Sequence, residues 1–264
     1  MDRGFGVAGS LDPNIIRQLA PLIESLGFRT LWINDTPGGD SLLGCAVACE
    51  VTTALRVATG VIPIDRRGAA HIITDVVDRG IPADRLTIGI GSGMAPKPLA
   101  RVRTAVAALR EKADPATMIS VGALGPRMTS LAASVGDDVL LNWLTPDAAR
   151  ISFQDIATAA SDASRATPRV SAYVRVAMAS TAIRRLTIEA ERYGSYPSYA
   201  AHFRRFGVEA IDTTIGSGDG AEVASRLNQF EGTVNEIVVR AITEAETIDA
   251  YRRLAIAVAP GTAG

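Results

Sequence analysis

The chain has 264 residues, of which 47% are hydrophobic and 21% are charged. This length suits one large domain or two small ones, and the apolar fraction can build a sizeable core, so the composition excludes a disordered chain. The net charge of -1 and the pI of about 6.2 give no reason to expect nucleic acid or an anionic membrane as a partner.

The start of the chain, from Met1 to Gly6, lacks the basic residues and the apolar run of a signal peptide. No stretch approaches the roughly 18 consecutive apolar residues of a membrane-spanning helix. We therefore expect a cytoplasmic protein with no membrane contact. The two cysteines, Cys45 and Cys49, have no second pair and no nearby histidine to complete a zinc site, so we expect small buried side chains and no metal.

Short runs rich in valine, isoleucine and leucine alternate with longer segments of helical period. Runs that are apolar at nearly every position are typical of parallel strands buried on both faces. Eight such strands predict an α/β protein with a (β/α)8 TIM barrel, as one domain over residues 1–264. The predicted strands are Gly4–Ala8, Thr30–Asn34, Val57–Ile62, Leu86–Ile90, Met118–Val121, Val139–Trp143, Val170–Met178 and Val234–Ala241.

The units between the strands are unequal in length. The first helix has Asp12 as its predicted N-cap, Pro13 in its first turn and Gly27 as a left-handed end. The segment from Thr181 to Thr233 is long and rich in aromatic residues, which predicts an insertion around helix seven. Within it, Val208–Ile215 reads as a possible extra strand.

Catalysis in such a barrel takes place at the C-terminal ends of the strands. Asp35 follows the second strand, where it either faces the barrel mouth or caps the turn. Gly60-Val61 interrupts the third strand and indicates a bulge or a close backbone approach. The fourth strand ends in Gly89-Ile90-Gly91-Ser92-Gly93, whose spacing does not match a Rossmann loop and whose small residues leave room for a ligand.

The loop after the fifth strand is the sharpest local signal for anion binding. It reads Gly122-Ala123-Leu124-Gly125-Pro126-Arg127-Met128 and leads into a helix. The glycines let backbone amides turn toward an anion, the helix N-terminus carries partial positive charge, and Arg127 adds a fork of donors. The residues alone leave open whether this is a phosphate site or an ordinary tight loop.

The two histidines do not form a catalytic set with a nucleophile. His71 is expected on the outer side of the third helix, and His202 lies in the insertion, from which it reaches a site only if the insertion folds over the mouth. Because no nucleophile and no paired metal ligands are evident, the chemistry is expected to come from a bound cofactor.

Five stretches in the right order resemble the luciferase-like monooxygenase superfamily, which includes flavin-dependent monooxygenases and deazaflavin (coenzyme F-420) oxidoreductases. The similarity is best from about residue 20 to 145. The stretches are Ile23–Asp35, Leu55–Val61, Asp84–Gly93, Val121–Met128 with Leu131-Ala132, and Asp137–Leu141.

The resemblance implies a barrel that carries a reduced flavin or deazaflavin and works on a small-molecule substrate as a homodimer or larger homo-oligomer. Gly60 and Val61 would form a bulge with a non-prolyl cis peptide against the ring. Asp35 would lie at the ring end as the candidate catalytic residue. The remaining predicted cofactor-binding residues are Gly91 and Ser92 at the mouth, and Gly122, Ala123, Gly125, Pro126, Arg127 and Met128 around the phosphate.

Two departures from the family pattern bear on activity. Many relatives have histidine after the aspartate where this chain has Thr36, and Met94-Ala95-Pro96-Lys97 replaces a longer segment after the fourth strand. Our first hypothesis is an F-420-dependent oxidoreductase that transfers a hydride; the alternatives are an FMN-dependent monooxygenase and a non-catalytic cofactor-binding protein. Only 2 of the 27 basic residues, Lys97 and Lys112, are lysines, and this arginine-rich composition favours the deazaflavin over FMN.

Overall fold

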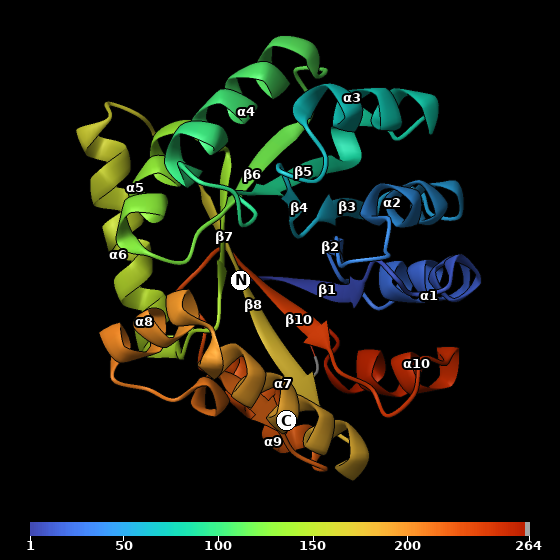
Figure 1. Ribbon diagram of the computed structural model, residues 1–264. Helices are drawn as coiled ribbons and strands as arrows, with labels where there is room; N and C mark the ends of the chain where they lie inside the picture. Colours follow the sequence, from blue (N-terminus) through green and yellow to red (C-terminus); the bar gives the residue numbers. More distant parts are fainter. Residues whose placement is uncertain (262–264) are drawn as a thin grey trace.

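Parallel strands follow one another around a closed barrel. The strands are β1 (Asp2–Ala8), β2 (Thr30–Asn34), β3 (Arg56–Thr59), β4 (Ile62–Pro63), β5 (Leu86–Gly91), β6 (Met118–Gly122), β7 (Asp138–Asn142), β8 (Arg169–Ala177), β9 (Thr214–Gly216) and β10 (Glu236–Ala241). Apart from β4, which pairs only with β5, strands β1 to β8 pair in sequence order, and β10 pairs in parallel with both β8 and β1 (Figure 1). This pairing closes the predicted (β/α)8 barrel. The computed structural model describes residues 1–261, so residues 262–264 of the predicted domain lie outside it.

Helices connect the strands and surround the barrel in Figure 1. They are α1 (Pro13–Ser25), α2 (Ser41–Glu50), α3 (Ala69–Asp78), α4 (Pro98–Lys112), α5 (Pro126–Val135), α6 (Pro146–Asp162), α7 (Ser180–Ser195), α8 (Pro197–Phe206), α9 (Gly220–Asn228) and α10 (Ile248–Ala257). The predicted start of α1 is confirmed, because the Asp12 carboxylate accepts a hydrogen bond from the Asn14 amide at 2.8 Å. Gly27 after its end has φ of 81°, as predicted. No helix among residues 1–261 is both long and apolar enough to cross a bilayer.

Seven predicted strands agree with the observed ones to within two residues at each end. The third does not, because the predicted continuous strand Val57–Ile62 is divided into β3 and β4. Gly60 and Val61 between them leave the ladder, and both pieces pair with β5. The break falls at Gly60, the glycine inside the predicted strand that indicated a bulge, although the predicted strand bounds ran across it.

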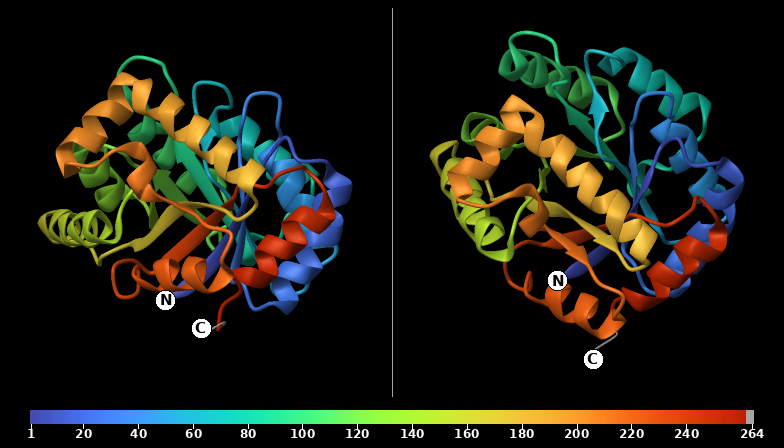
Figure 2. Two further views of the ribbon diagram at one scale, coloured as in Figure 1. Left: turned by 90° about the horizontal axis from the view of Figure 1, so that it is seen from below. Right: turned by 60° about the horizontal axis from the view of Figure 1, so that its bottom comes forward.

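The predicted insertion around helix seven is present and contains α7, α8, the 3₁₀ helix η2 (Ala210–Thr213), β9 and α9. The predicted extra strand Val208–Ile215 is only partly correct, since η2 takes up its middle and β9 begins at Thr214. β9 pairs with Arg175–Ala177 of β8, beyond the point where β7 stops. In Figure 2, α7 and α8, in gold and orange, lie along one side of the barrel, and α9 packs against α10.

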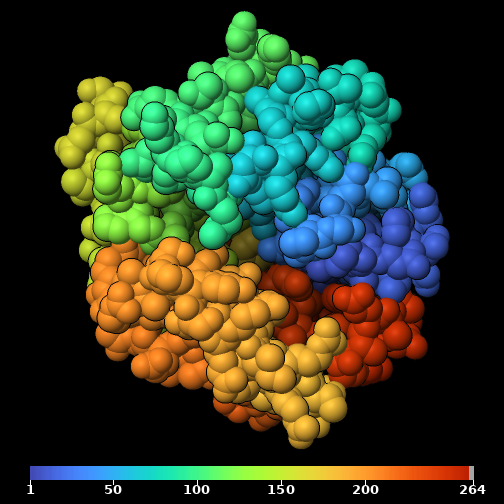
Figure 3. All heavy atoms as spheres, in the orientation of Figure 1, coloured from blue at the N-terminus to red at the C-terminus, as the bar shows by residue number. Residues whose placement is uncertain are grey.

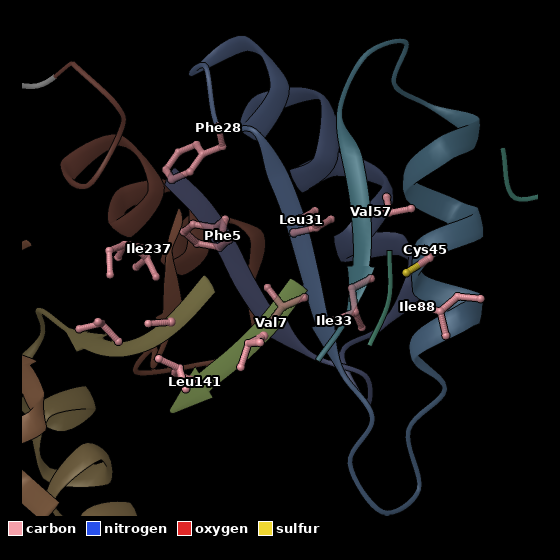
Figure 4. Close-up of a cluster of buried hydrophobic side chains, with 14 of the residues drawn as sticks. Phe5, Val7, Phe28, Leu31, Ile33, Cys45, Val57, Ile88, Leu141 and Ile237 are labelled. Carbon is pink, nitrogen blue, oxygen red and sulfur yellow. The ribbon is translucent and has the colours of Figure 1, made fainter. Parts of the chain in front are cut away.

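The main core lies between the strands and the outer helices. Figure 4 shows part of it, with Cys45 of α2 directed toward Val57 of β3 and with Phe5 close to Phe28. The centroids of the two phenylalanine rings are 5.5 Å apart, in an edge-to-face arrangement. The predicted burial of Cys45 is confirmed, whereas Cys49 is only partly buried. A second, smaller cluster fills the barrel interior and consists of Trp32, Ala58, Leu140, Tyr173 and Val238, with Val61 packed against it.

Candidate active site at the mouth of the barrel

The loops at the C-terminal ends of the strands surround a hollow. In Figure 3 this hollow lies near the centre of the molecule, between blue, green, gold and red segments. In a barrel of this kind, these loops carry the functional side chains. Among residues 1–261, no group of three or more histidine, cysteine, aspartate or glutamate side chains is placed to hold a metal ion.

A backbone bulge stands at the mouth between β3 and β4. The peptide bond from Gly60 to Val61 is cis, as the resemblance implied. The Gly60 backbone amide donates to the Ile33 carbonyl at 2.8 Å, and the side-chain Nδ2 of Asn34 donates to the Gly60 carbonyl at 2.7 Å. On the other side of the bulge, the Thr59 hydroxyl bonds both the carbonyl and the amide of Gly89 at 2.9 Å. The bulge is therefore held from both neighbouring strands.

The glycines of β5 make room for this bulge. A Cβ atom at Gly89 would lie 1.9 Å from the Thr59 carbonyl oxygen, and one at Gly91 would lie 2.6 Å from the Val61 side chain. A Cβ at Gly122 on β6 would also meet Val61, at 3.1 Å. We expect small residues here to leave space for a ligand. In the structure, the lack of side chains at these glycines makes room for the bulge and for the Val61 side chain. Ser92, the other predicted residue of this loop, donates its hydroxyl to the Gly93 carbonyl at 3.1 Å.

Asp35 is held by side chains of two loops. Its carboxylate forms an ion pair with Arg66 at 2.7 Å and accepts a hydrogen bond from the Ser41 hydroxyl at 2.7 Å. Arg66 also donates to the Asp35 carbonyl at 2.6 Å, and the Asp35 side chain is only 7% exposed. These contacts give Asp35 a positioning role between the loop after β2 and the loop after β4. Its catalytic role stays a prediction.

The predicted phosphate loop leads into α5 as the sequence indicates. Pro126 is the first helical residue, and the N-cap Gly125 has no side chain to bond the first free amides. Arg127 is exposed, and within residues 1–261 its guanidinium has no hydrogen bond or ion pair. These donors are the ones an anion would need.

Other members of the predicted loop have partners inside the protein. The Ala123 amide donates to the Leu140 carbonyl at 3.0 Å, and the Met128 amide donates to the Gly125 carbonyl at 3.0 Å. The Met128 side chain packs against the core. The anion-binding potential of the loop is thus concentrated at Gly125 and Arg127.

His202 of α8 connects the insertion to the predicted phosphate loop by a contact with its backbone. Its Nδ1 lies 2.9 Å from the Leu124 carbonyl oxygen, and its Nε2 lies 2.8 Å from the Trp143 carbonyl oxygen. The insertion therefore does reach the mouth, which was the condition for a role of His202. Burial lowers the pKa of this imidazole, although the two carbonyl groups oppose the effect. His71 is exposed on α3, as predicted.

Arg175 is a site residue that sequence reasoning missed. On β8 it forms an ion pair with Glu189 of α7 at 2.7 Å, and it donates to Asn142 at 2.7 Å. Its guanidinium lies 3.6 Å from the centroid of the Trp143 ring. The sequence signal that could have identified Arg175 was its charge inside the largely apolar predicted strand Val170–Met178. Through its ion pair with Glu189, Arg175 attaches α7 to strand β8.

Buried polar atoms without partners are a further feature of the mouth. Five buried side-chain atoms have no hydrogen-bond partner among the described residues. Four of them lie at this end of the barrel or inside it, namely Asn34 Oδ1, Thr36 Oγ1, Trp143 Nε1 and Tyr173 Oη, and the fifth is Arg79 Nη1 after α3. Each such atom costs free energy unless a ligand or water satisfies it. The bulge, the donors at α5 and these four atoms together form a site with both apolar and polar contacts.

Comparison with solved structures shows the fold of flavin and deazaflavin enzymes. A coenzyme F420 dependent tetrahydromethanopterin reductase from Methanopyrus kandleri is 16% identical with a TM-score of 0.74, covering 98% of each chain. An F420-dependent secondary alcohol dehydrogenase is 14% identical with a TM-score of 0.76, covering 97% of this chain and 98% of the other. The FMN-bound oxygenating constituent of 3,6-diketocamphane monooxygenase from Pseudomonas putida is 14% identical with a TM-score of 0.70, covering 98% of each chain.

Sequence comparison identifies the family. No curated protein matches the chain. The family model for luciferase-like monooxygenases, however, matches residues 99–254, which is more than half of the chain. The matched part contains the predicted phosphate loop, Arg175 and His202. The chain belongs to the luciferase-like monooxygenase family.

Proposed function

We propose that this protein is an oxidoreductase that binds coenzyme F-420 at the barrel mouth and transfers a hydride to or from a small organic substrate. The observation that carries the proposal is the start of α5, where the uncapped N-terminus and the guanidinium of Arg127 lie together without partners among the described residues. An anionic group is the ligand that such a pair of donors favours.

Different residues of the mouth would bind different parts of such a cofactor. Gly125 and Arg127 would hold its phosphate, and Val61 on the bulge would support its ring. When bound, the deazaflavin supplies a ring carbon that accepts or donates a hydride. The protein contributes positioning: Asn34 and Thr59 fix the bulge, and His202 fixes the carbonyl of Leu124 in the phosphate loop. The helices α7 and α8 limit the access of water on one side.

Support for a deazaflavin comes from two of the neighbours, which are named as F420-dependent, and from the arginine-rich composition. Another neighbour contains FMN, so an FMN-dependent monooxygenase is the second candidate. The two cofactors differ toward oxygen, because reduced flavin reacts with it readily and reduced deazaflavin poorly. An oxygen electrode, used with each reduced cofactor, separates the candidates: rapid oxygen uptake with reduced FMN and substrate favours the monooxygenase.

A cofactor-binding protein without turnover is the third candidate, and the short loop after β5 motivates it. The Asp65 carboxylate holds this loop in place, because it accepts hydrogen bonds from the Met94 amide at 2.7 Å and the Ala95 amide at 3.2 Å. Met94 itself is 98% exposed. Tight binding of F-420 without hydride transfer to any substrate in a broad screen would favour this candidate.

The phosphate site is tested by fluorescence titration of the purified protein with F-420 and FMN separately. Arg127→Ala combined with Gly125→Val removes the charged donor and blocks the approach to the amides. We expect binding to weaken by at least about 1.5 kcal/mol, the lower end for a hydrogen bond to a charged group. Arg252→Ala, at an exposed position of α10, is the control and should bind as the parent does. An unchanged dissociation constant in the double variant would overturn the site assignment.

A further inference from the structure

A cavity of about 240 Å³ opens at the mouth between α7 and the C-terminal end of β10. The gold α7 and the red segment after β10 can be found beside each other in Figure 3. The charged residues that line the cavity are Arg185, Glu189, Arg192, Arg240 and Glu246. None of these residues belongs to the phosphate loop or to the bulge, so the cavity is a separate part of the mouth.

Arg240 is the unusual member of this lining. It is half-buried on β10, where it is the register partner of both Gly6 on β1 and Arg175 on β8. Alternation along the strand places its side chain on the same face as Val238, which lies in the barrel interior. A Cβ atom at Gly6 would lie 2.9 Å from the Tyr173 ring and 3.4 Å from the Arg240 Cα, so the strands pack closely here and a side chain at Gly6 would crowd Arg240.

Of the two adjacent guanidinium groups of Arg175 and Arg240, only that of Arg175 forms an ion pair among the described residues. Glu189 is paired with Arg175 at 2.7 Å. Among residues 1–261, the Arg240 guanidinium donates only to the Ala241 carbonyl, at 2.6 Å, and it forms no ion pair. A cation that is partly removed from water and not neutralised costs free energy. A ligand that brings a negative charge would offset this cost.

The surrounding groups increase the positive character of the cavity. The Arg185 guanidinium donates to the Thr243 carbonyl at 2.6 Å, and the Arg192 guanidinium lies 5.6 Å from the centroid of the Tyr193 ring; within the described part of the chain neither forms an ion pair. Burial raises the pKa of Glu189, but the charges of Arg175 and then Arg240 outweigh it and hold that pKa below its usual value. Glu246 is exposed and has no ion pair within the described residues.

We propose that this cavity binds the carboxylate of a small organic acid, the substrate of the hydride transfer, and that Arg240 is the residue that selects it. Arg185 and Arg192 add charge at the rim. The volume is below the roughly 300–1,000 Å³ of sites for drug-sized ligands, which favours a small acid. This assignment of the substrate class rests on the proposed function, because it requires a cofactor at the neighbouring part of the mouth.

The test is calorimetric titration of the full chain with small monocarboxylates, including benzoate and butyrate, each matched with its neutral amide. We expect every acid that binds to bind more tightly than its amide. Arg240→Met should weaken acid binding at least about tenfold, the loss expected for a hydrogen bond to a charged group, without changing amide binding. Arg184→Met is the matched control, since Arg184 is exposed on α7 and does not line the cavity. Arg192→Met, an exposed position, covers the case in which Arg240→Met fails to fold, and should weaken acid binding about threefold.

The same titrations are repeated with F-420 or FMN present. Acid binding that depends on Arg240 while neither cofactor binds would support the cavity and refute the proposed function. Cofactor binding without any preference for acids over amides would refute the acid site in the cavity and leave the proposed function standing. Acid affinity that survives in both Arg240→Met and Arg192→Met would overturn the proposal. Competition between an acid and a cofactor would also overturn it, because the cavity would then hold part of the cofactor.

Discussion

Two buried carboxyl groups lie inside the barrel at the N-terminal ends of its strands, and they predict how stability depends on pH. Glu236 begins β10 and Asp138 begins β7, and they are 3% and 2% exposed. Trp32 donates its indole N–H to Glu236 at 3.4 Å. Burial, followed by the negative charge of Asp138, raises the pKa of Glu236 to about 7.

Glu236→Gln removes this ionisation and keeps an oxygen for Trp32. In the unfolded chain the carboxyl ionises near its ordinary pKa of 4.5, so the folded parent holds more protons than the unfolded chain between that pH and about 7. The stabilising contribution of the neutral carboxyl is therefore complete below the unfolded pKa and is lost as the pH rises through the folded one. The difference between the two pKa values corresponds to about 3 kcal/mol. We expect the variant to exceed the parent in stability at pH 8 by up to this amount.

Urea unfolding between pH 4.5 and 8, followed by tryptophan fluorescence, measures the free energy of unfolding of both proteins. Subtracting the two profiles isolates Glu236 together with its interaction with the charge of Asp138. His202 contributes a rise of stability with pH, because burial lowers its pKa, but it does so in both proteins. Glu231→Gln, at an exposed position, is the control and should follow the parent. Parallel profiles for the parent and Glu236→Gln would refute the reasoning.

Two further predictions concern the bulge and the attachment of α7. Gly91→Ala places a Cβ 2.6 Å from the Val61 side chain, so we expect a loss of roughly 1–3 kcal/mol in urea unfolding, and Val61→Ala in the same chain should restore most of it. A loss that Val61→Ala does not reduce would show that the contact is not the cause. Arg175→Met leaves the Glu189 carboxylate without its partner and should cost roughly 3 kcal/mol, with faster amide exchange in α7 by mass spectrometry. Unchanged exchange in α7 would contradict the role of Arg175 as its attachment.

Local pattern alone was enough for much of the fold. The barrel strands are apolar along their length because parallel strands are buried on both faces, and this property is visible in each strand separately. The start of α1 at Asp12 and Pro13 and the start of α5 at Pro126 were likewise predictable, because capping depends on residues within one turn. The bulge at Gly60 could be located for the same reason.

Contacts between distant segments decided the rest. Gly91 looked like space for a ligand, but its neighbour in the fold is Val61, 30 positions earlier. His202 meets the Leu124 carbonyl across 78 positions, and Arg240 lies beside Arg175 only because the barrel closes between β8 and β10. Helical and strand periods extend over a few residues, so they carry no information about which side chains meet at such separations. The sequence by itself determined the barrel and the place of its mouth, and the closure of the barrel determined which charges and carbonyl groups face one another there.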